Sequence, residues 1–337
     1  MQHEITEARE LLDDQGNLLH RGWARSPLLH YDRSRVRGRL KEWDYYCVLD
    51  DQYGLALTVA DLGYLGLVSI VWLDLAQGTF HTVDEMRPFT RGRLGLPPSS
   101  RRGDVVFEGR KVRLAVRRDD GGRSLEVDVA SFQDGQPLRA RVRLEQDPDA
   151  DSLVVATPFP GKPNAFYYNE KINCMPAGGS VQVGETSHTF DPGAAMGVLD
   201  WGRGVWTYRN TWYWGSASWR LDGVPLGWNI GYGFGDLSTH TENLVVHGGR
   251  GHKLDQVAFH IPASSYLEPW RFSSNDGRFE MDFQPVLDRS AVVNLLVFRS
   301  EQHQVFGRFT GKVVLDDGAV LEVEGLPGFA EEVSNRW

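Results

Sequence analysis

The sequence has little of what marks disulfide-rich, membrane-spanning or nucleic-acid-binding proteins. Its two cysteines cannot build a disulfide framework, so a reducing compartment is expected. The most apolar window, residues 62–73, lies between two aspartates and is far shorter than the ~20 residues of a membrane-spanning helix. The formal net charge of −9 argues against general binding to nucleic acids or anionic membranes, and neither is an expected partner.

Signals for export, cofactor binding and nucleophilic catalysis are missing as well. The first residues, MQHEITEARELLDD, are acidic where a secretory signal is basic and then apolar, so we expect a cytoplasmic location. The glycine-rich segments 231–237 and 247–253 lack the spacing of dinucleotide- and phosphate-binding loops. Several histidines and Glu242 fall between residues 240 and 260, in a spacing that matches no known metal-ligand pattern. No Gly-x-Ser-x-Gly elbow is present, and the sequence predicts neither a metal nor a redox cofactor.

Helical periodicity is confined to one short candidate, residues 5–12, whereas strand patterns fill the chain from about residue 40 onwards. The clearest patterns are hairpins with Asp-Gly or Gly-Gly turns at residues 111–146, 218–234 and 311–325. Many short strands without βαβ alternation predict an all-β protein, built as a sandwich or an up-and-down barrel.

The length of 337 residues predicts two such β domains of comparable size. We place them at residues 1–195 and 196–337. Within residues 87–143, arginines alternate with apolar residues, as on a strand with one solvated and one buried face. Aromatic residues that could stack on nucleic-acid bases are nearly absent there. Within this stretch, residues 91–104 are expected to form an exposed loop.

Tryptophans are concentrated in one segment, around a single carboxylate. Asp200, Arg203 and Arg209 lie in this segment, and indoles alone would suit a β core. Charged groups are costly to bury unless they form pairs or act chemically. We therefore interpret the segment as the lining of a ligand site, with core packing as the alternative. Six of the eleven tryptophans of the chain belong to it: Trp201, Trp206, Trp212, Trp214, Trp219 and Trp228.

A preceding strand, residues 166–176, carries a second set of polar residues. Side chains alternate between the two faces of a strand, so this stretch presents two different sets. If either face turns inward, its polar groups line the interior of the β domain. If it turns outward, they are solvated. One face carries Tyr167, Asn169, Lys171 and Asn173, and the other carries Tyr168, Glu170 and Ile172.

Asp200 in an apolar cavity would suit acid catalysis. Burial raises the pKa of an aspartate above its usual ~4, which leaves a protonated acid able to protonate an alkene. Indole faces would stabilise the resulting carbocation. Contact with Arg203 or Arg209 would instead favour proton abstraction with stabilisation of an oxyanion, because a neighbouring cation lowers the pKa of an aspartate. Both alternatives are open at the level of sequence.

Over most of its length the sequence resembles the bacterial domain-of-unknown-function family 2804. The resemblance rests on residues 22–32, 41–46, 168–176, 199–206 and 306–337. It implies no particular activity.

More remotely, the central segment resembles the lipocalin-like group of carotenoid 1,2-hydratases and AttH-like proteins. This resemblance implies two successive lipocalin-like β-barrel domains, and some fungal relatives of the group are pericyclic cyclases. Asp200 and Gly204 match the aspartate and the last glycine of the group's Tyr-x-Asp-His-Asn-Trp-Gly motif, and residues 212–215 match its Trp-x-Trp-Gly strand. The group's polar pair on the preceding strand falls near Lys171 and Asn173. The other motif positions are occupied here by Val198, Trp201, Gly202 and Arg203.

These observations lead to an enzyme hypothesis and two alternatives. The enzyme would be a hydratase, cyclase or isomerase that acts on a hydrophobic small molecule by acid–base chemistry. The alternatives are a non-catalytic carrier of a hydrophobic ligand, and a carbohydrate-active protein with Glu170 or Glu242 as a second carboxylate. The expected catalytic residues are Asp200, Lys171 and Arg203. The expected substrate-binding residues are Trp201, Trp212, Trp214, Trp228, Tyr168, Asn173 and Arg209.

Overall fold

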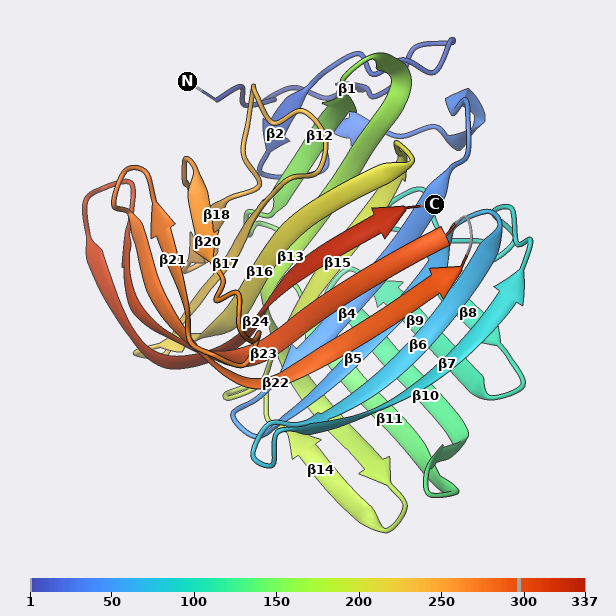
Figure 1. Cartoon of the computed structure of the whole chain (residues 1–337), viewed down its shortest axis with the longest axis vertical. Coiled ribbons are helices and arrows are strands. Elements are labelled where there is room, and N and C mark those ends of the chain that lie inside the picture. Colours follow the sequence, from blue (N-terminus) through green and yellow to red (C-terminus); the bar gives the residue numbers. More distant parts are fainter. Residues whose placement is uncertain (1, 296–297, 337) are drawn as a thin grey trace.

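The chain folds almost entirely into antiparallel β-structure, as the sequence predicts (Figure 1). The computed structural model describes residues 2–295 and 298–336. Within these residues one short 3-10 helix, η1 (Arg33–Arg35), accompanies 24 strands. No helix in this part of the chain has the length and apolar character needed to cross a membrane.

The helix expected over residues 5–12 does not form. Part of that segment is instead the short strand β1 (Arg9–Glu10), which pairs in parallel with β3 (Leu29–His30). The next residues, Leu11 and Leu12, are fully buried in an apolar core. The prediction was wrong because so short a helix has little stability of its own, and tertiary packing therefore decides the local structure.

The first sheet has thirteen strands, which are β2 and β4 to β15. Its main path runs in the order β7-β6-β5-β4-β15-β13-β11-β10-β9-β8, with β2, β12 and β14 attached at the side. The strands are β2 (Gly22–Ala24), β4 (Lys41–Leu49), β5 (Tyr53–Asp61), β6 (Leu65–Asp74), β7 (Thr79–Pro88), β8 (Val105–Glu108), β9 (Val112–Asp119), β10 (Gly122–Gln133), β11 (Gln136–Glu145), β12 (Leu153–Phe159), β13 (Lys162–Val183), β14 (Thr186–Phe190) and β15 (Met196–Val205).

The second sheet has nine strands in the order β19-β18-β17-β16-β24-β23-β22-β21-β20. The strands are β16 (Arg209–Leu221), β17 (Val224–Tyr232), β18 (Leu244–His247), β19 (Arg250–Lys253), β20 (Val257–His260), β21 (Trp270–Ser274), β22 (Phe279–Leu295), β23 (Phe298–Val314) and β24 (Val320–Arg336). The chain changes sheet between Val205 and Arg209, because β15 pairs with β4 and β13 in the first sheet. The change falls beyond the boundary expected after residue 195.

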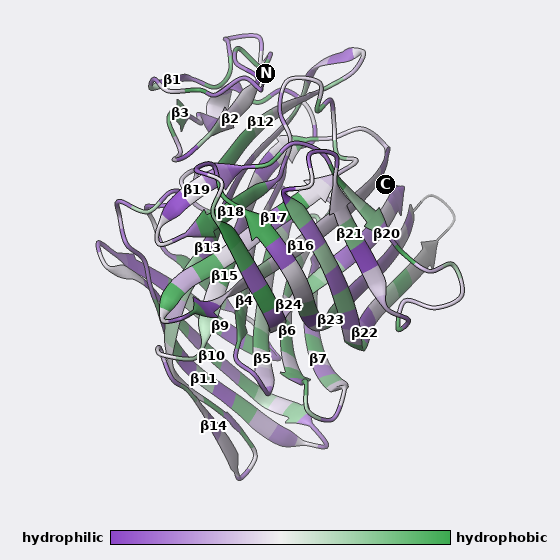
Figure 2. Ribbon diagram, turned by 90° about the vertical axis from the view of Figure 1, so that its left-hand side faces the viewer, coloured by the Kyte–Doolittle hydropathy of each residue, from purple (hydrophilic) through white to green (hydrophobic). Residues whose placement is uncertain are grey.

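Each sheet curls around an apolar core of its own, and hydrophobic and hydrophilic positions alternate along many strands (Figure 2). Leu114 and Trp201 belong to the first core, and Trp228 and Phe283 to the second. The fold is thus the expected pair of lipocalin-like β domains. The convex faces of the two sheets also meet, and their contact buries a third apolar cluster. We call this contact between β4, β13 and β15 on one side and β16, β23 and β24 on the other the seam.

The first core also encloses buried ion pairs around Arg203. The Arg203 guanidinium is fully buried and lies 2.9 Å from a carboxylate oxygen of Asp44 and 3.5 Å from one of Glu42. Arg203 also stacks on the ring of Trp201, with 4.3 Å from its Cζ to the ring centroid. Pairing of this kind makes the burial of such charges tolerable.

Residues 91–104 are less exposed than the sequence predicts. Leu96 and Ser100 are buried, and carbonyl groups along this loop accept hydrogen bonds from arginine side chains of the first domain. The donor and acceptor pairs are Arg33 with Leu96, Arg203 with Pro97, Arg118 with Ser99 and Arg123 with Ser100.

Replacing Arg203 with methionine is expected to destabilise the protein by roughly 3 to 5 kcal/mol, because Glu42 and Asp44 lose a buried partner. Urea denaturation measures this change. The matched control is Arg209→Met, at an exposed position six residues further along, for which we expect a change below about 0.5 kcal/mol. Equal effects of the two substitutions would contradict a structural role for the buried ion pairs.

Candidate functional site

Asp200 lies in the middle of β15 with its side chain in the seam, where it is 7% exposed. Alternation along the strand puts it on the same face as Val198, away from the first core. The strand register places Lys171 of β13 directly opposite Asp200. Lys171 Nζ is 2.9 Å from Asp200 Oδ1, so two of the predicted catalytic residues form a buried ion pair.

Two further donors hold the Asp200 carboxylate. Asn169 Nδ2 donates to Oδ1 at 2.5 Å, and Trp43 Nε1 donates to Oδ2 at 2.9 Å. Trp43 can lie across β15 because position 202 is glycine; a Cβ at Gly202 would be 2.1 Å from the indole. Together with Lys171, three donors contact the two carboxylate oxygens. Asp200 is therefore held as an acceptor.

The Lys171 ammonium lies between this carboxylate and an indole. Its Nζ is 4.3 Å from the ring centroid of Trp214, close enough for a cation–π interaction. The Trp214 indole is itself fixed by a hydrogen bond from its Nε1 to Asn229 Oδ1 at 2.5 Å. The positive charge therefore has a defined position in the seam.

Glu331 of β24 brings a second carboxyl group into the same region. Trp212 Nε1 donates to its Oε1 at 3.0 Å, and Gln304 Nε2 lies 3.3 Å from its Oε2. Burial raises the pKa of Glu331 to about 7; the Trp212 hydrogen bond opposes this shift, and the charge of Asp200 adds to it. Glu331 is thus poised to gain or lose a proton near neutral pH.

Glu242, from the connection between β17 and β18, supplies a third carboxyl group. Burial raises its pKa to about 7; the positive charge of Lys171 opposes this shift, and the charge of Asp200 adds to it. Tyr167 of β13 is also close: burial raises its pKa, and the charges of Asp200, Glu242 and Glu331 add to the effect. Groups from both sheets therefore act on one another electrostatically.

Glu242 and Tyr167 differ from the other members of this cluster in having free polar atoms. Within residues 2–295 and 298–336, neither the Glu242 carboxylate nor the Tyr167 hydroxyl forms a hydrogen bond with a side-chain or backbone group. Neither group is among the polar atoms of these residues that are completely cut off from solvent. These atoms therefore face space that water or a small ligand group can enter. That space is narrow, since the side chains are only 6% and 4% exposed.

Aromatic rings form the walls beside these groups. Trp43 stacks on Tyr167 with 5.7 Å between ring centroids and 10° between ring planes. Phe234 packs edge-on against Tyr167 and Trp212, at 4.8 Å and 5.3 Å. Trp206 packs edge-on against Trp43 at 4.8 Å. The charged groups are thus surrounded by apolar faces, which strengthens every electrostatic interaction among them.

Three of the predicted substrate-binding residues lie in the seam. Trp212 and Trp214 contact the charged cluster directly, through the interactions with Glu331 and Lys171 described above. Asn173 lies further along β13 and donates to Ser216 Oγ at 2.9 Å. Asn173 therefore bridges the two sheets beside the cluster.

The other four predicted binding residues lie elsewhere. Trp201 and Tyr168 fill the first core and Trp228 fills the second, because strand alternation turns them away from the seam. Arg209 is exposed at the beginning of β16. None of these four side chains reaches Asp200. The tryptophans of the segment are therefore divided among the first core, the second core and the seam.

Arg203 does not meet Asp200 either. Three residues apart on one strand, the two side chains point to opposite faces, and Arg203 pairs with acids in the first core. Glu170 is turned the same way and binds Arg101 and Ser152, so it does not lie beside Asp200. Of the two candidate second carboxylates, Glu242 is the one that interacts with Asp200.

Sequence reasoning missed Glu331 and Trp43. The only local signal for Glu331 is the acidic pair Glu331–Glu332 inside an otherwise apolar stretch of the last strand. Trp43 lies in the segment 41–46 that carries part of the family resemblance. Neither feature reveals that the residue lies opposite Asp200, since this depends on how the two sheets pack.

The histidines near Glu242 do not gather around it. His240 Nε2 is 2.9 Å from Thr157 Oγ1, and His260 Nε2 is 2.8 Å from Ser273 Oγ. No group of three or more His, Cys, Asp or Glu side chains is placed to hold a metal ion in the part of the chain that the structure describes.

The fold and this cluster define a two-domain, lipocalin-like all-β protein with a buried acid–base cluster between its sheets. The model of the family described as Domain of unknown function (DUF2804) matches residues 2–337, and the chain belongs to that family. The resemblance expected from sequence is confirmed.

The solved structures that resemble this one include the following two. An AttH-like protein from Nitrosomonas europaea superposes with a TM-score of 0.50 and 13% sequence identity, covering 89% of this chain and 92% of that chain. Kievitone hydratase from Nectria haematococca gives a TM-score of 0.48 and 10% identity, covering 89% of each chain. No curated protein matches the sequence. The likeness to the AttH-like protein shows a shared fold.

Glu331→Gln is expected to change how stability depends on pH. Because the pKa of Glu331 is about 7 in the folded protein, above that of an unfolded glutamate, the folded state binds more protons between about pH 4.5 and 7 and loses stability as pH rises through this range. Glutamine removes this loss. Urea denaturation should show the variant gaining roughly 2 kcal/mol relative to the parent between pH 5 and pH 8. Glu322→Gln, at an exposed position of the same strand, should show no such gain in stability. Equal pH profiles for all three proteins would refute the raised pKa of Glu331.

Proposed function

We propose that this protein is an enzyme that adds or removes protons on an apolar small molecule bound in the seam. Hydration, cyclisation and isomerisation are the reactions of this class, and they need no redox or metal cofactor when side chains move the protons. The proposed location is the cytoplasm, in keeping with two free cysteines.

One observation carries the proposal: Glu242 and Glu331 are buried carboxyl groups whose pKa values lie near 7, and they flank a fixed ion pair. A general acid or base works best when its pKa is close to the working pH, and such values cluster at functional sites. A structural role alone would not require two carboxyl groups to share an apolar seam.

The four charged groups have different roles in this proposal. Glu242 exchanges a proton with the ligand, because its carboxyl atoms form no hydrogen bond with the described residues and border a narrow space that a small ligand group can enter. Glu331 is the second proton carrier. Asp200 is occupied by three donors and keeps Lys171 in place, so it does not deliver the proton, in contrast to the hypothesis drawn from sequence. The Lys171 ammonium stabilises negative charge that develops on the ligand.

A hydration would proceed as follows. The Glu242 carboxyl group donates its proton to one carbon of a polarised double bond, and a water oxygen bonds to the other carbon. The proton lost by that water passes to the Glu331 carboxylate, and exchange with solvent restores both groups. The rings of Trp212 and Phe234 keep bulk water away from the reacting groups. Electrostatic interactions between the ligand and the charged side chains are stronger as a result.

The walls of the site specify the class of substrate. Indole and phenyl faces offer large apolar contact areas, so the reacting molecule has an apolar, unsaturated body. The connection 233–243 carries both Phe234 and Glu242, and we propose that it moves to admit the ligand. Gly233 and Gly235 in this connection both adopt positive φ values, a conformation that favours glycine.

Glu242→Gln tests the proposed function. The purified protein is incubated with apolar metabolite extracts in D2O and in H2 18O, and mass spectrometry follows deuterium or 18O incorporation into extracted compounds. We expect the parent protein to label at least one compound and Glu242→Gln to do so about 100-fold more slowly or worse. Glu322→Gln is the matched control and should retain the parent rate.

Two outcomes would overturn this assignment. Labelling at the parent rate by Glu242→Gln would remove the residue from the chemistry. Recovery of a copurified apolar ligand, unchanged and unlabelled after incubation, would instead identify the protein as a carrier.

A further inference from the structure

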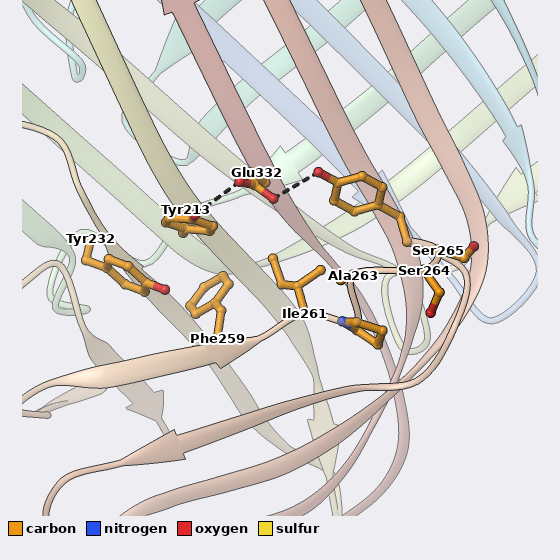
Figure 3. Close-up of a pocket in the computed structure, with 10 residues that line it drawn as sticks. Tyr213, Tyr232, Phe259, Ile261, Ala263, Ser264, Ser265 and Glu332 are labelled. Carbon is orange, nitrogen blue, oxygen red and sulfur yellow. Dashed lines mark hydrogen bonds between the residues drawn. The ribbon is translucent and has the colours of Figure 1, made fainter.

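A separate pocket opens at one end of the second barrel, away from the seam (Figure 3). It has a volume of about 340 Å³. Side chains of β16, β17, β20 and β24 line it together with the connection from β20 to β21. Among its lining residues there is one acidic side chain, Glu332, and there is no lysine, arginine or histidine. The pocket therefore carries a single negative charge.

Glu332 is held at one side of the pocket by two phenols. Tyr213 donates its hydroxyl hydrogen to one carboxylate oxygen at 3.0 Å, and Tyr266 donates to the other at 2.9 Å (Figure 3). Each oxygen keeps a further lone pair for a ligand. No cationic side chain pairs with Glu332 in the described part of the chain, so its charge lacks a counter-ion.

Three aromatic rings form the adjoining wall. Tyr213 and Tyr232 are stacked, with ring centroids 4.7 Å apart and planes 25° apart. Phe259 meets both rings edge-on, at 5.9 Å from Tyr213 and 5.4 Å from Tyr232. Figure 3 shows Tyr213 next to Glu332, with Phe259 and Tyr232 further from the carboxylate, so a ligand that spans the pocket can contact these rings and the negative charge together.

This pocket and the seam lie on opposite faces of the same two strands. On β16, Trp212 faces the seam and Tyr213 faces the pocket; on β24, Glu331 faces the seam and Glu332 the pocket. The pocket is thus a second site, independent of the proposed function of the seam.

The chemistry of the lining selects among ligand classes. An anion would be repelled by Glu332. A neutral ligand would gain contact with the rings but would leave the charge of Glu332 unpaired. A cation gains from both, because aromatic faces attract positive charge and the carboxylate pairs with it. The effect of Glu332 is already visible within the pocket: burial raises the pKa of Tyr213 to about 12, and the carboxylate adds to that shift.

We propose that this pocket binds a small organic cation that carries an alkylated ammonium group. The alkyl groups lie against Tyr213, Tyr232 and Phe259, and the positive charge faces Glu332. Alkylation favours this site over a bare ammonium ion, because methyl groups contact the rings while the charge stays weakly hydrated.

Calorimetric titration with choline tests the proposal, with 3,3-dimethyl-1-butanol as its neutral counterpart of the same shape and methyl glucoside as a neutral sugar. The full-length protein should bind choline saturably at concentrations of about 1 mM and bind the neutral counterpart about tenfold more weakly. Equal binding of the two compounds, tighter binding of the sugar, or no saturable binding of choline would each overturn the proposal.

Substitutions locate the binding in this pocket. Glu332→Gln preserves shape and removes the charge, so choline affinity should fall about tenfold. Tyr232→Leu should also weaken it, whereas Glu322→Gln, at an exposed position of the same strand, should bind like the parent. Unchanged affinity in a folded Glu332→Gln would place any choline binding elsewhere. If that variant fails to fold, the comparison of choline with its neutral counterpart on the parent protein decides the question.

Discussion

The buried ion pair between Lys171 and Asp200 is the interaction on which the seam depends. Its charges are within reach of both Glu242 and Glu331: Asp200 raises the pKa of each, and Lys171 lowers it. Removing either partner would leave an uncompensated charge between two apolar faces, which is among the costliest changes a protein interior can suffer. Asn169 and Trp43 donate further hydrogen bonds to the two carboxylate oxygens of Asp200. One cross-strand pair thus sets the electrostatic environment of a site that draws groups from both sheets.

Strand alternation explains why a single segment serves two interiors. Successive residues of β15 point either into the first barrel or into the seam, so Asp200 and Arg203 enter separate ion-pair networks although they are three residues apart. The same rule on β24 separates Glu331 in the seam from Glu332 in the pocket of the second barrel. Glycine has a specific role in this arrangement. Gly202 leaves room for the Trp43 ring to lie across β15 and reach the carboxylate.

Much of the architecture could be predicted from local patterns. Alternation and Asp-Gly turns identify the all-β fold, because they report on each strand and its hairpin neighbour. The sequence also identified Lys171 and Asp200 as candidates, but their pairing depends on the register of β13 against β15, which no local pattern gives. Glu331 and Trp43 could not be found in this way, since their relation to Asp200 depends on register across several strands and on the packing of one sheet against the other. The roles of Trp201 and Trp228 were hidden likewise, because an indole looks the same in sequence whether it fills a core or lines a site.

The most direct test of this account is the titration of glutamates labelled with 13C at the carboxyl carbon, followed by NMR. We expect two resonances to titrate near pH 7, one lost in Glu242→Gln and the other in Glu331→Gln. A spectrum in which every glutamate titrates at about pH 4 to 5 would show that the seam does not perturb its carboxyl groups and would contradict the acid–base role proposed for it.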